Sequence, residues 1–77
     1  MNANRRKTLT EIENKICDLR DDLQVALDDE QDAFESMPES LAAGERGQAM
    51  EEAIQAMEEA ISCLDDACSS INDAREP

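Results

Sequence analysis

Histidine, tryptophan and tyrosine are absent from the sequence, and Phe34 is its one aromatic residue. Histidine is the commonest general acid or base in enzymes, and aromatic rings are the surfaces on which unpaired nucleic-acid bases stack. Di-iron helical bundles are excluded too, because their Glu-x-x-His elements require histidine. We therefore expect no catalytic residues, no cofactor and no direct nucleic-acid binding.

Long apolar runs are also missing. No stretch approaches the roughly 20 apolar residues of a membrane span, and the basic start MNANRRK is not followed by the apolar core of a signal peptide. We therefore expect a cytoplasmic protein that does not bind membranes.

Basic residues are scarce, since seven Lys and Arg stand against 20 Asp and Glu, for a formal net charge of −13 at pH 7. Residues 1–20 hold five basic and three acidic residues, whereas residues 21–77 hold two basic and 17 acidic ones. A field of this sign repels nucleic acids and anionic membranes and attracts cationic surfaces. The composition therefore favours a basic surface of another protein as the partner.

Cysteine is limited to Cys17, Cys63 and Cys68, an odd number. Cys63 and Cys68 are five residues apart, so on a helix they point in different directions and cannot form a disulfide without unwinding it. A zinc site would need a fourth ligand and a spacing that these residues do not have. We interpret all three as reduced, small, semi-apolar helix residues.

A seven-residue unit dominates residues 51–74, which read EEAIQAM EEAISCL DDACSSI NDA. Apolar residues recur at alternating spacings of four and three, the pattern of a helix that packs against other helices. Alanines line one flank of this apolar stripe. The predicted packing seam of the helix comprises Met50, Ile54, Met57, Ile61, Leu64, Cys68 and Ile71.

An earlier helix is predicted to begin at Thr8, because Thr8 and Glu11 match a capping box and an apolar series follows directly. We interpret residues 1–7 as a flexible basic leader and residues 8–35 as the helix. Its apolar series keeps the heptad phase at first and then drifts toward the natural helical period. The predicted seam comprises Leu9, Ile12, Ile16, Leu19, Leu23, Leu27 and Phe34.

A connector is predicted over residues 36–45, where Pro38 interrupts the helical pattern. Ser36 and Glu39 are suited to cap one brief turn through Leu41, and Gly44 is suited to close it. The second long helix is predicted over residues 46–74.

The predicted fold class is all-α, an antiparallel two-helix hairpin with heptad packing that forms one domain over residues 8–75. Two long helices of similar length joined by a short connection favour this arrangement. A single hairpin leaves half of each apolar stripe exposed. We therefore expect a homodimer, assembled as a four-helix bundle.

Acidic pairs recur every seven residues on the solvent sides of both predicted helices. Two carboxylates per heptad amount to one per roughly 5 Å of helix, and two adjacent helices approach the charge density of duplex DNA, about one per 1.7 Å. These acidic faces are candidate partner-binding surfaces, and the alternative is a solvated face that only keeps the protein in solution. The candidate residues are Asp21, Asp22, Asp28, Asp29, Asp32, Glu35, Glu51, Glu52, Glu58, Glu59, Asp65 and Asp66.

Metal-binding patterns match only weakly, so we predict no metal ligands. The first, third, fifth and twelfth positions of an EF-hand-like loop are taken by Asp28, Glu30, Asp32 and Glu39. Ala33 stands where that loop needs glycine for its sharp turn. Acidic pairs three residues apart, which helical pyrophosphohydrolases use, have a counterpart on the second helix only at its frayed end.

The stretch DDEQDAFESMPESL, followed by ERGQAMEEAIQAMEEAI, resembles a family of small acidic helical-hairpin proteins encoded by phages, prophages and other bacterial mobile elements. The resemblance covers residues 28–61 most clearly, and family members often carry Ser where this chain has Gly44. It implies a mobile-element origin and a helical hairpin, without a settled activity. Small acidic phage proteins often occupy the basic nucleic-acid sites of CRISPR effectors, restriction enzymes or transcription factors.

The leading hypothesis is therefore a non-catalytic acidic protein-binding module that inhibits a host protein by mimicking nucleic acid, an anti-CRISPR or anti-restriction candidate. An alternative is a structural or adaptor coiled-coil protein whose apolar seam recruits a partner helix. A third hypothesis is metal sensing at the connector.

Overall fold

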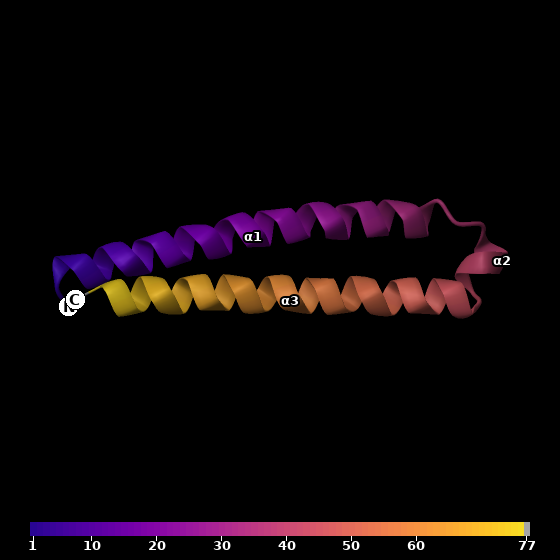
Figure 1. Cartoon of the computed structure of the whole chain (residues 1–77). Helices are drawn as coiled ribbons and strands as arrows, with labels where there is room; N and C mark the ends of the chain where they lie inside the picture. Colours follow the sequence, from indigo (N-terminus) through magenta and orange to yellow (C-terminus); the bar gives the residue numbers. More distant parts are fainter. Residues whose placement is uncertain (77) are drawn as a thin grey trace.

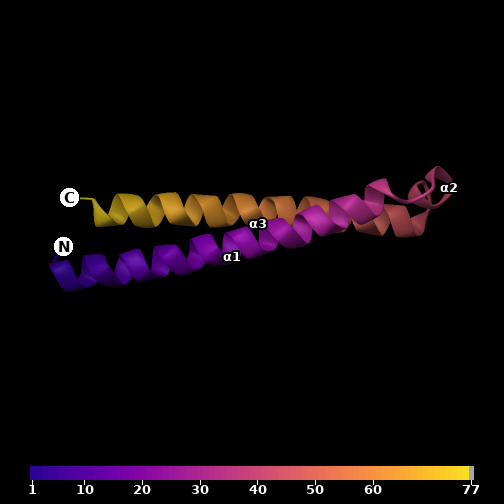
Figure 2. The ribbon, with the colours of Figure 1, turned by 90° about the horizontal axis from the view of Figure 1, so that it is seen from above.

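The computed structural model describes residues 1–76, and in this range it contains helices and no strands. Its elements are α1 (Ala3–Glu35), α2 (Glu39–Ala42) and α3 (Glu45–Arg75). The long helices α1 and α3 lie side by side and run in opposite directions, with α2 in the connection at one end (Figures 1 and 2). The predicted all-α class is confirmed, and the molecule is a rod of 59 × 15 × 12 Å.

Helix α1 begins at Ala3, so the predicted start at Thr8 is wrong. Its N-cap is Asn2, whose Oδ1 accepts a hydrogen bond from the backbone N–H of Arg5 at 2.8 Å. The Thr8 hydroxyl instead donates to the carbonyl oxygen of Asn4 at 3.0 Å, inside the helix. Asparagine caps at least as well as threonine, and the residues between the two caps do not break a helix. Residues 3–7 of the predicted flexible leader are therefore the first residues of α1.

The connection between the long helices contains the brief helical turn that the sequence predicts. Pro38 precedes α2, and no side chain caps this helix, so the predicted caps from Ser36 and Glu39 do not form. Ser36 instead ends α1, where its backbone N–H donates to the carbonyl oxygen of Asp32. Gly44 lies at the N-cap of α3 with φ of −89° rather than closing α2, whose C-cap is Ala43.

Gly47 fixes how closely α2 approaches α3. It is buried in the first turns of α3, and a Cβ atom at this position would lie 2.6 Å from the Cα of Ala42 and closer still to the Ala42 carbonyl group. Two carbon atoms ordinarily pack 3.5–4.0 Å apart. Only glycine therefore permits the last residue of α2 to rest on the backbone of α3.

The core of the described chain is small. Leu27 of α1 and Ile61 of α3 are its buried hydrophobic residues, with exposed fractions of 4% and 7%. All seven predicted seam residues of α3 are buried or half-buried, so its heptad pattern locates the face that α3 turns toward α1. On α1, five of the seven predicted residues are also buried or half-buried.

Ile12 and Leu19, the other two residues of the predicted seam, are 40% and 60% exposed in the single chain and lie outside the α1–α3 interface. The face of α1 toward α3 is centred on residues seven apart, namely Glu13, Arg20, Leu27 and Phe34. One residue turns a helix by about 100°, so Ile12 and Leu19 lie on the flank of that face. Glu13 and Arg20, which pair with Arg75 and Asp65 across the interface, lie at the centre of that face.

Those charged residues tie the N-terminal half of α1 to the C-terminal half of α3. A guanidinium nitrogen of Arg75 lies 2.8 Å from a carboxylate oxygen of Glu13 and donates to the hydroxyl of Thr10 at 3.1 Å. Arg20 Nε donates to Asp65 Oδ1 at 3.0 Å. These contacts join polar side chains of α1 and α3 across the helix interface.

Candidate protein-binding faces

All twelve predicted partner-binding carboxylates are exposed, six on α1 and six on α3. Their recurrence at seven-residue intervals keeps them along the edges and outer sides of the α1–α3 interface, because the same period sets the interface. Four of them have a side-chain partner within the described chain. Arg20 lies near Asp21 and bonds Asp65, Gln24 donates to Asp28, and Gln31 donates to Glu58. Most of the acidic faces are thus available to another molecule.

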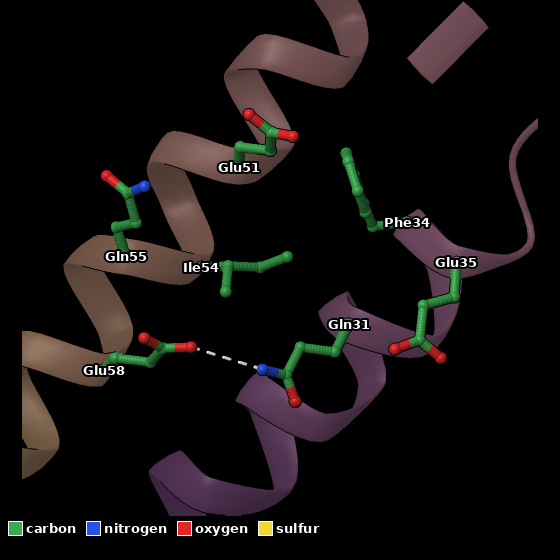
Figure 3. Close-up of a pocket in the computed structure, with 7 residues that line it drawn as sticks. All are labelled: Gln31, Phe34, Glu35, Glu51, Ile54, Gln55 and Glu58. Atoms are coloured by element: carbon green, nitrogen blue, oxygen red, sulfur yellow. Dashed lines mark hydrogen bonds between the residues drawn. The ribbon is translucent and has the colours of Figure 1, made fainter. Parts of the chain in front are cut away.

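A pocket lies between α1 and α3 near the connection, with a volume of about 430 Å³ (Figure 3). Phe34 from α1 and Ile54 from α3 point into the space between the helices. The remaining lining residues are polar or acidic, and they comprise Gln31, Glu35, Glu51, Gln55 and Glu58. Gln31 Nε2 donates to Glu58 Oε1 at 3.3 Å across the pocket (Figure 3).

This combination of apolar and acidic lining residues suits the side chain of an arginine or lysine. The hydrocarbon stem of such a side chain packs on apolar surface while its charged head stays near the carboxylates. A guanidinium also stacks favourably on an aromatic face such as that of Phe34. The pocket is therefore a place where a basic partner could insert one anchoring side chain.

The sequence patterns did not reveal this pocket as a unit. They assigned Phe34 and Ile54 to the packing seam and Glu35, Glu51 and Glu58 to two separate acidic faces. These residues of α1 and α3 come together only when the two helices pack antiparallel. The register of that packing was not predictable from either helix alone. The one feature of the sequence that pointed to this pocket was the drift of the apolar series out of heptad phase at Phe34.

A second surface is apolar and lies on the flank of the helix pair. Ile12 and Leu19 each precede a contact residue of α1 by one position, as Ala60 and Ala67 do on α3. In an antiparallel pair, positions that precede the contact residues lie on the same side of both helices. Large exposed apolar side chains on α1 thus share a side with half-buried alanines on α3.

Residues 28–39 do not form an EF-hand-like calcium loop, because most of them are helical. Asp28, Glu30 and Asp32 lie within α1, which continues to Glu35, whereas Glu39 is the first residue of α2. A calcium loop cannot form where the backbone is already helical. Among residues 1–76, no cluster of three or more acidic or cysteine side chains is arranged to hold a metal ion. Within that same range, no helix is long and apolar enough to cross a membrane.

No family model matches the chain, and no curated protein or solved structure matches it significantly. The function has to be argued from the surfaces described above.

Proposed function

We propose that the protein is a non-catalytic binding module whose acidic faces occupy a basic, nucleic-acid-binding surface of a host protein. The observation that carries the proposal is the exposure of all twelve predicted carboxylates along a rod 59 Å long. A net charge of −13 on 77 residues adds long-range attraction to a cationic partner. This negative charge raises the association rate with a cationic partner and repels nucleic acids.

The spacing of the carboxylates supports mimicry of a nucleic acid. At 1.5 Å per residue, two carboxylates per heptad on each of two adjacent helices give about one charge per 2.6 Å, compared with one per 1.7 Å in duplex DNA. The pocket formed around Phe34 and Ile54 provides a site for one basic side chain, which a uniform row of charges lacks. Charge gives the long-range attraction, and the pocket gives a fixed point of attachment.

A mobile-element origin is part of this proposal. It is supported by the resemblance of residues 28–61 to small acidic proteins of phages and prophages. The host proteins in question are bacterial defence enzymes and regulators that bind nucleic acids, including CRISPR effectors and restriction enzymes. The protein then acts in the cytoplasm of the bacterial host.

We further propose that the protein is a homodimer in which two pairs of helices form a four-helix bundle. The small core supports this proposal, because a chain of this length gains only about 3–5 kcal/mol from a single core. The flank with Ile12 and Leu19 on α1 and Ala60 and Ala67 on α3 is the surface that the second copy covers. Small residues let helices approach closely, and exposed Leu and Ile gain from burial. Sedimentation equilibrium tests the proposal, and a Leu19→Lys variant is expected to be monomeric.

A second candidate function is supported by the same flank. In this alternative, Ile12 and Leu19 recruit a helix of another protein, and the acidic faces only keep the protein in solution. The protein is then a structural or adaptor coiled-coil protein. The two candidates differ in which surface a partner needs.

The experiment captures partners from a bacterial lysate with the tagged protein and with two variants of it. One variant carries Glu51→Gln, Glu52→Gln, Glu58→Gln and Glu59→Gln, and the other carries Leu19→Ser. Under the acidic-face proposal, the glutamine variant loses the partner and the serine variant keeps it. Exposed charges are screened over about 8 Å at physiological ionic strength, so high salt also releases the partner.

Duplex DNA added to the captured complex distinguishes mimicry from general charge attraction. Release by DNA, together with identification of a nucleic-acid-binding protein, is the expected result. A partner that stays bound in high salt and with DNA, but is lost with Leu19→Ser, would favour the adaptor function.

A further inference from the structure

The sulfur atoms of Cys17 on α1 and Cys68 on α3 lie 3.2 Å apart, in hydrogen-bond contact across the helix interface. In a disulfide, two sulfurs lie about 2.05 Å apart, so a movement of about 1 Å would join this pair. We propose that Cys17 and Cys68 form a redox-controlled disulfide that links α1 to α3. The proposal is independent of the acidic-face function.

The pairing of Cys17 with Cys68 was not predictable from the sequence. Only Cys63 and Cys68 are close along the chain, and five residues turn a helix by about 500°, which points them in different directions. Cys17 is 51 residues from Cys68 and comes next to it only because the helices are antiparallel. The odd third thiol, Cys63, is exposed and has no sulfur partner in the described chain.

The two thiols differ in their surroundings, so we expect Cys17 to react with an oxidant before Cys68. Cys17 is exposed and meets an oxidant from solvent first, whereas Cys68 is half-buried. The pKa of Cys68 is raised from 9.0 to about 11, chiefly by its hydrogen bond with Cys17 and then by burial and by the nearby Glu13 of α1 and Asp65 of α3. Cys68 therefore retains its proton at neutral pH and is the slower nucleophile.

A small disulfide of the glutathione type is the oxidant. The thiolate of Cys17 attacks one of its sulfurs, which forms a mixed disulfide on Cys17 and releases one glutathione thiolate. The thiolate of Cys68 then attacks the Cys17 sulfur, forms the Cys17–Cys68 bond and releases the second glutathione thiolate. The two protein thiols lose two electrons to glutathione disulfide, and the two protons that they give up to solvent are balanced by the two that the released glutathione thiolates take up to become thiols.

The position of the bond gives it a consequence for the fold. The two long helices are joined covalently at one end by residues 36–44 only. Toward the other end they are held by polar contacts such as that between Arg75 and Glu13. A Cys17–Cys68 disulfide adds a covalent link in this second half and prevents the helices from separating. Oxidation would thereby stabilise the helix pair, and reduction would release it.

The test uses Cys63→Ser as the parent, because it removes the thiol that the proposal does not involve. The parent and its Cys17→Ser and Cys68→Ser derivatives are treated with glutathione disulfide at pH 8 and analysed by intact mass spectrometry and non-reducing electrophoresis. The parent is expected to become a monomer lighter by two hydrogen atoms, with a melting temperature several degrees higher, and dithiothreitol reverses both changes. The Cys68→Ser derivative is expected to keep a glutathione adduct on Cys17.

Circular dichroism of the reduced proteins checks that each variant is folded before oxidation. The proposal is overturned if the folded parent retains a glutathione adduct on Cys17 without closing, or if it forms only covalent dimers. It is also overturned if the closed monomer appears in either serine derivative.

Discussion

Replacing Gly47 by alanine is expected to destabilise the protein, although the same change in an ordinary helix stabilises it. Alanine exceeds glycine in helix propensity by about 1 kcal/mol. At Gly47, however, the new Cβ would lie 2.6 Å from the Cα of Ala42, about 1 Å inside the normal packing distance. The clash is with backbone atoms, so no side-chain rotation relieves it. The connection must move away from α3.

The magnitude follows from these opposing contributions. Forcing an extra methyl group into a packed site costs typically about 1–3 kcal/mol, and a backbone neighbour places this site toward the upper end. The net expectation is a loss of about 1–2 kcal/mol in the free energy of unfolding. For a chain of this size, that loss lowers the melting temperature by roughly 4–16 °C.

Gly44→Ala is the matched control. A Cβ at Gly44 would meet the carbonyl oxygen of Leu41 at 3.5 Å, an ordinary contact, and its φ of −89° suits any residue. This variant is expected to lose about 0.5–1 kcal/mol, because alanine is a poorer N-cap than glycine, and the loss involves no clash. Thermal melts followed by circular dichroism at one protein concentration measure both variants. A Gly47→Ala protein that melts at or above the wild-type temperature would refute the close approach of α2 to α3.

Three further predictions concern the core, the helix start and the thiol pair. Leu27→Ala removes the most buried apolar side chain and is expected to cost about 2–4 kcal/mol in urea unfolding; a loss below about 1 kcal/mol would contradict its place in the core. Asn2→Ala is expected to cost up to about 1 kcal/mol locally and to speed amide hydrogen exchange in the first turns of α1, whereas Thr8→Ala has little effect. The reverse order of these two effects would restore the predicted start at Thr8. The raised pKa of Cys68 means that the folded state holds its proton more tightly than the unfolded state, so the associated stability is present below pH 9.0 and is lost as the pH rises toward about 11. Melts from pH 8 to 11 should show a loss in reduced wild-type protein that is smaller in Cys68→Ala, and equal losses would exclude this contribution.

The heptad pattern made most of α3 predictable. Its apolar residues repeat without interruption from Met50 to Ile71, and the observed bounds differ from the predicted ones by one residue at each end. A repeat of this kind fixes both the helix and its packing face because one period determines both. The position of α2 was also predictable, since Pro38 ends one helical segment and Gly44 precedes the next.

The start of α1 was less predictable because two good caps compete. Asn2 and Thr8 each have a side-chain oxygen that can accept a backbone hydrogen bond, and local pattern alone does not rank them. The helix extends to the earlier cap because Arg5, Arg6 and Lys7 favour helix and nothing between the caps interrupts it. The apolar series that begins after Thr8 indicates where α1 starts to pack against α3. It does not indicate where the helix itself starts.

The contacts between helices were the least predictable feature. The pairing of Cys17 with Cys68, the ion pair of Glu13 with Arg75 and the pocket at Phe34 all depend on the register of two antiparallel helices. Each helix gives its own period, but the register depends on both helices and on the length of the connection. The close fit of Gly47 against Ala42 fixes how the connection packs on α3.

The rotation of α1 about its axis decides which of its side chains contact α3 and which are exposed. Its apolar stripe alone would place Ile12 and Leu19 against α3, yet Glu13 and Arg20 lie there and pair with Arg75 and Asp65. Partly exposed ion pairs contribute little to stability, about 0–1 kcal/mol each. A sequence that departs from its own apolar pattern in this way is expected to gain something outside the monomer. In the proposed homodimer, the second copy would cover the side of the helix pair that carries Ile12 and Leu19, and the acidic faces would stay exposed.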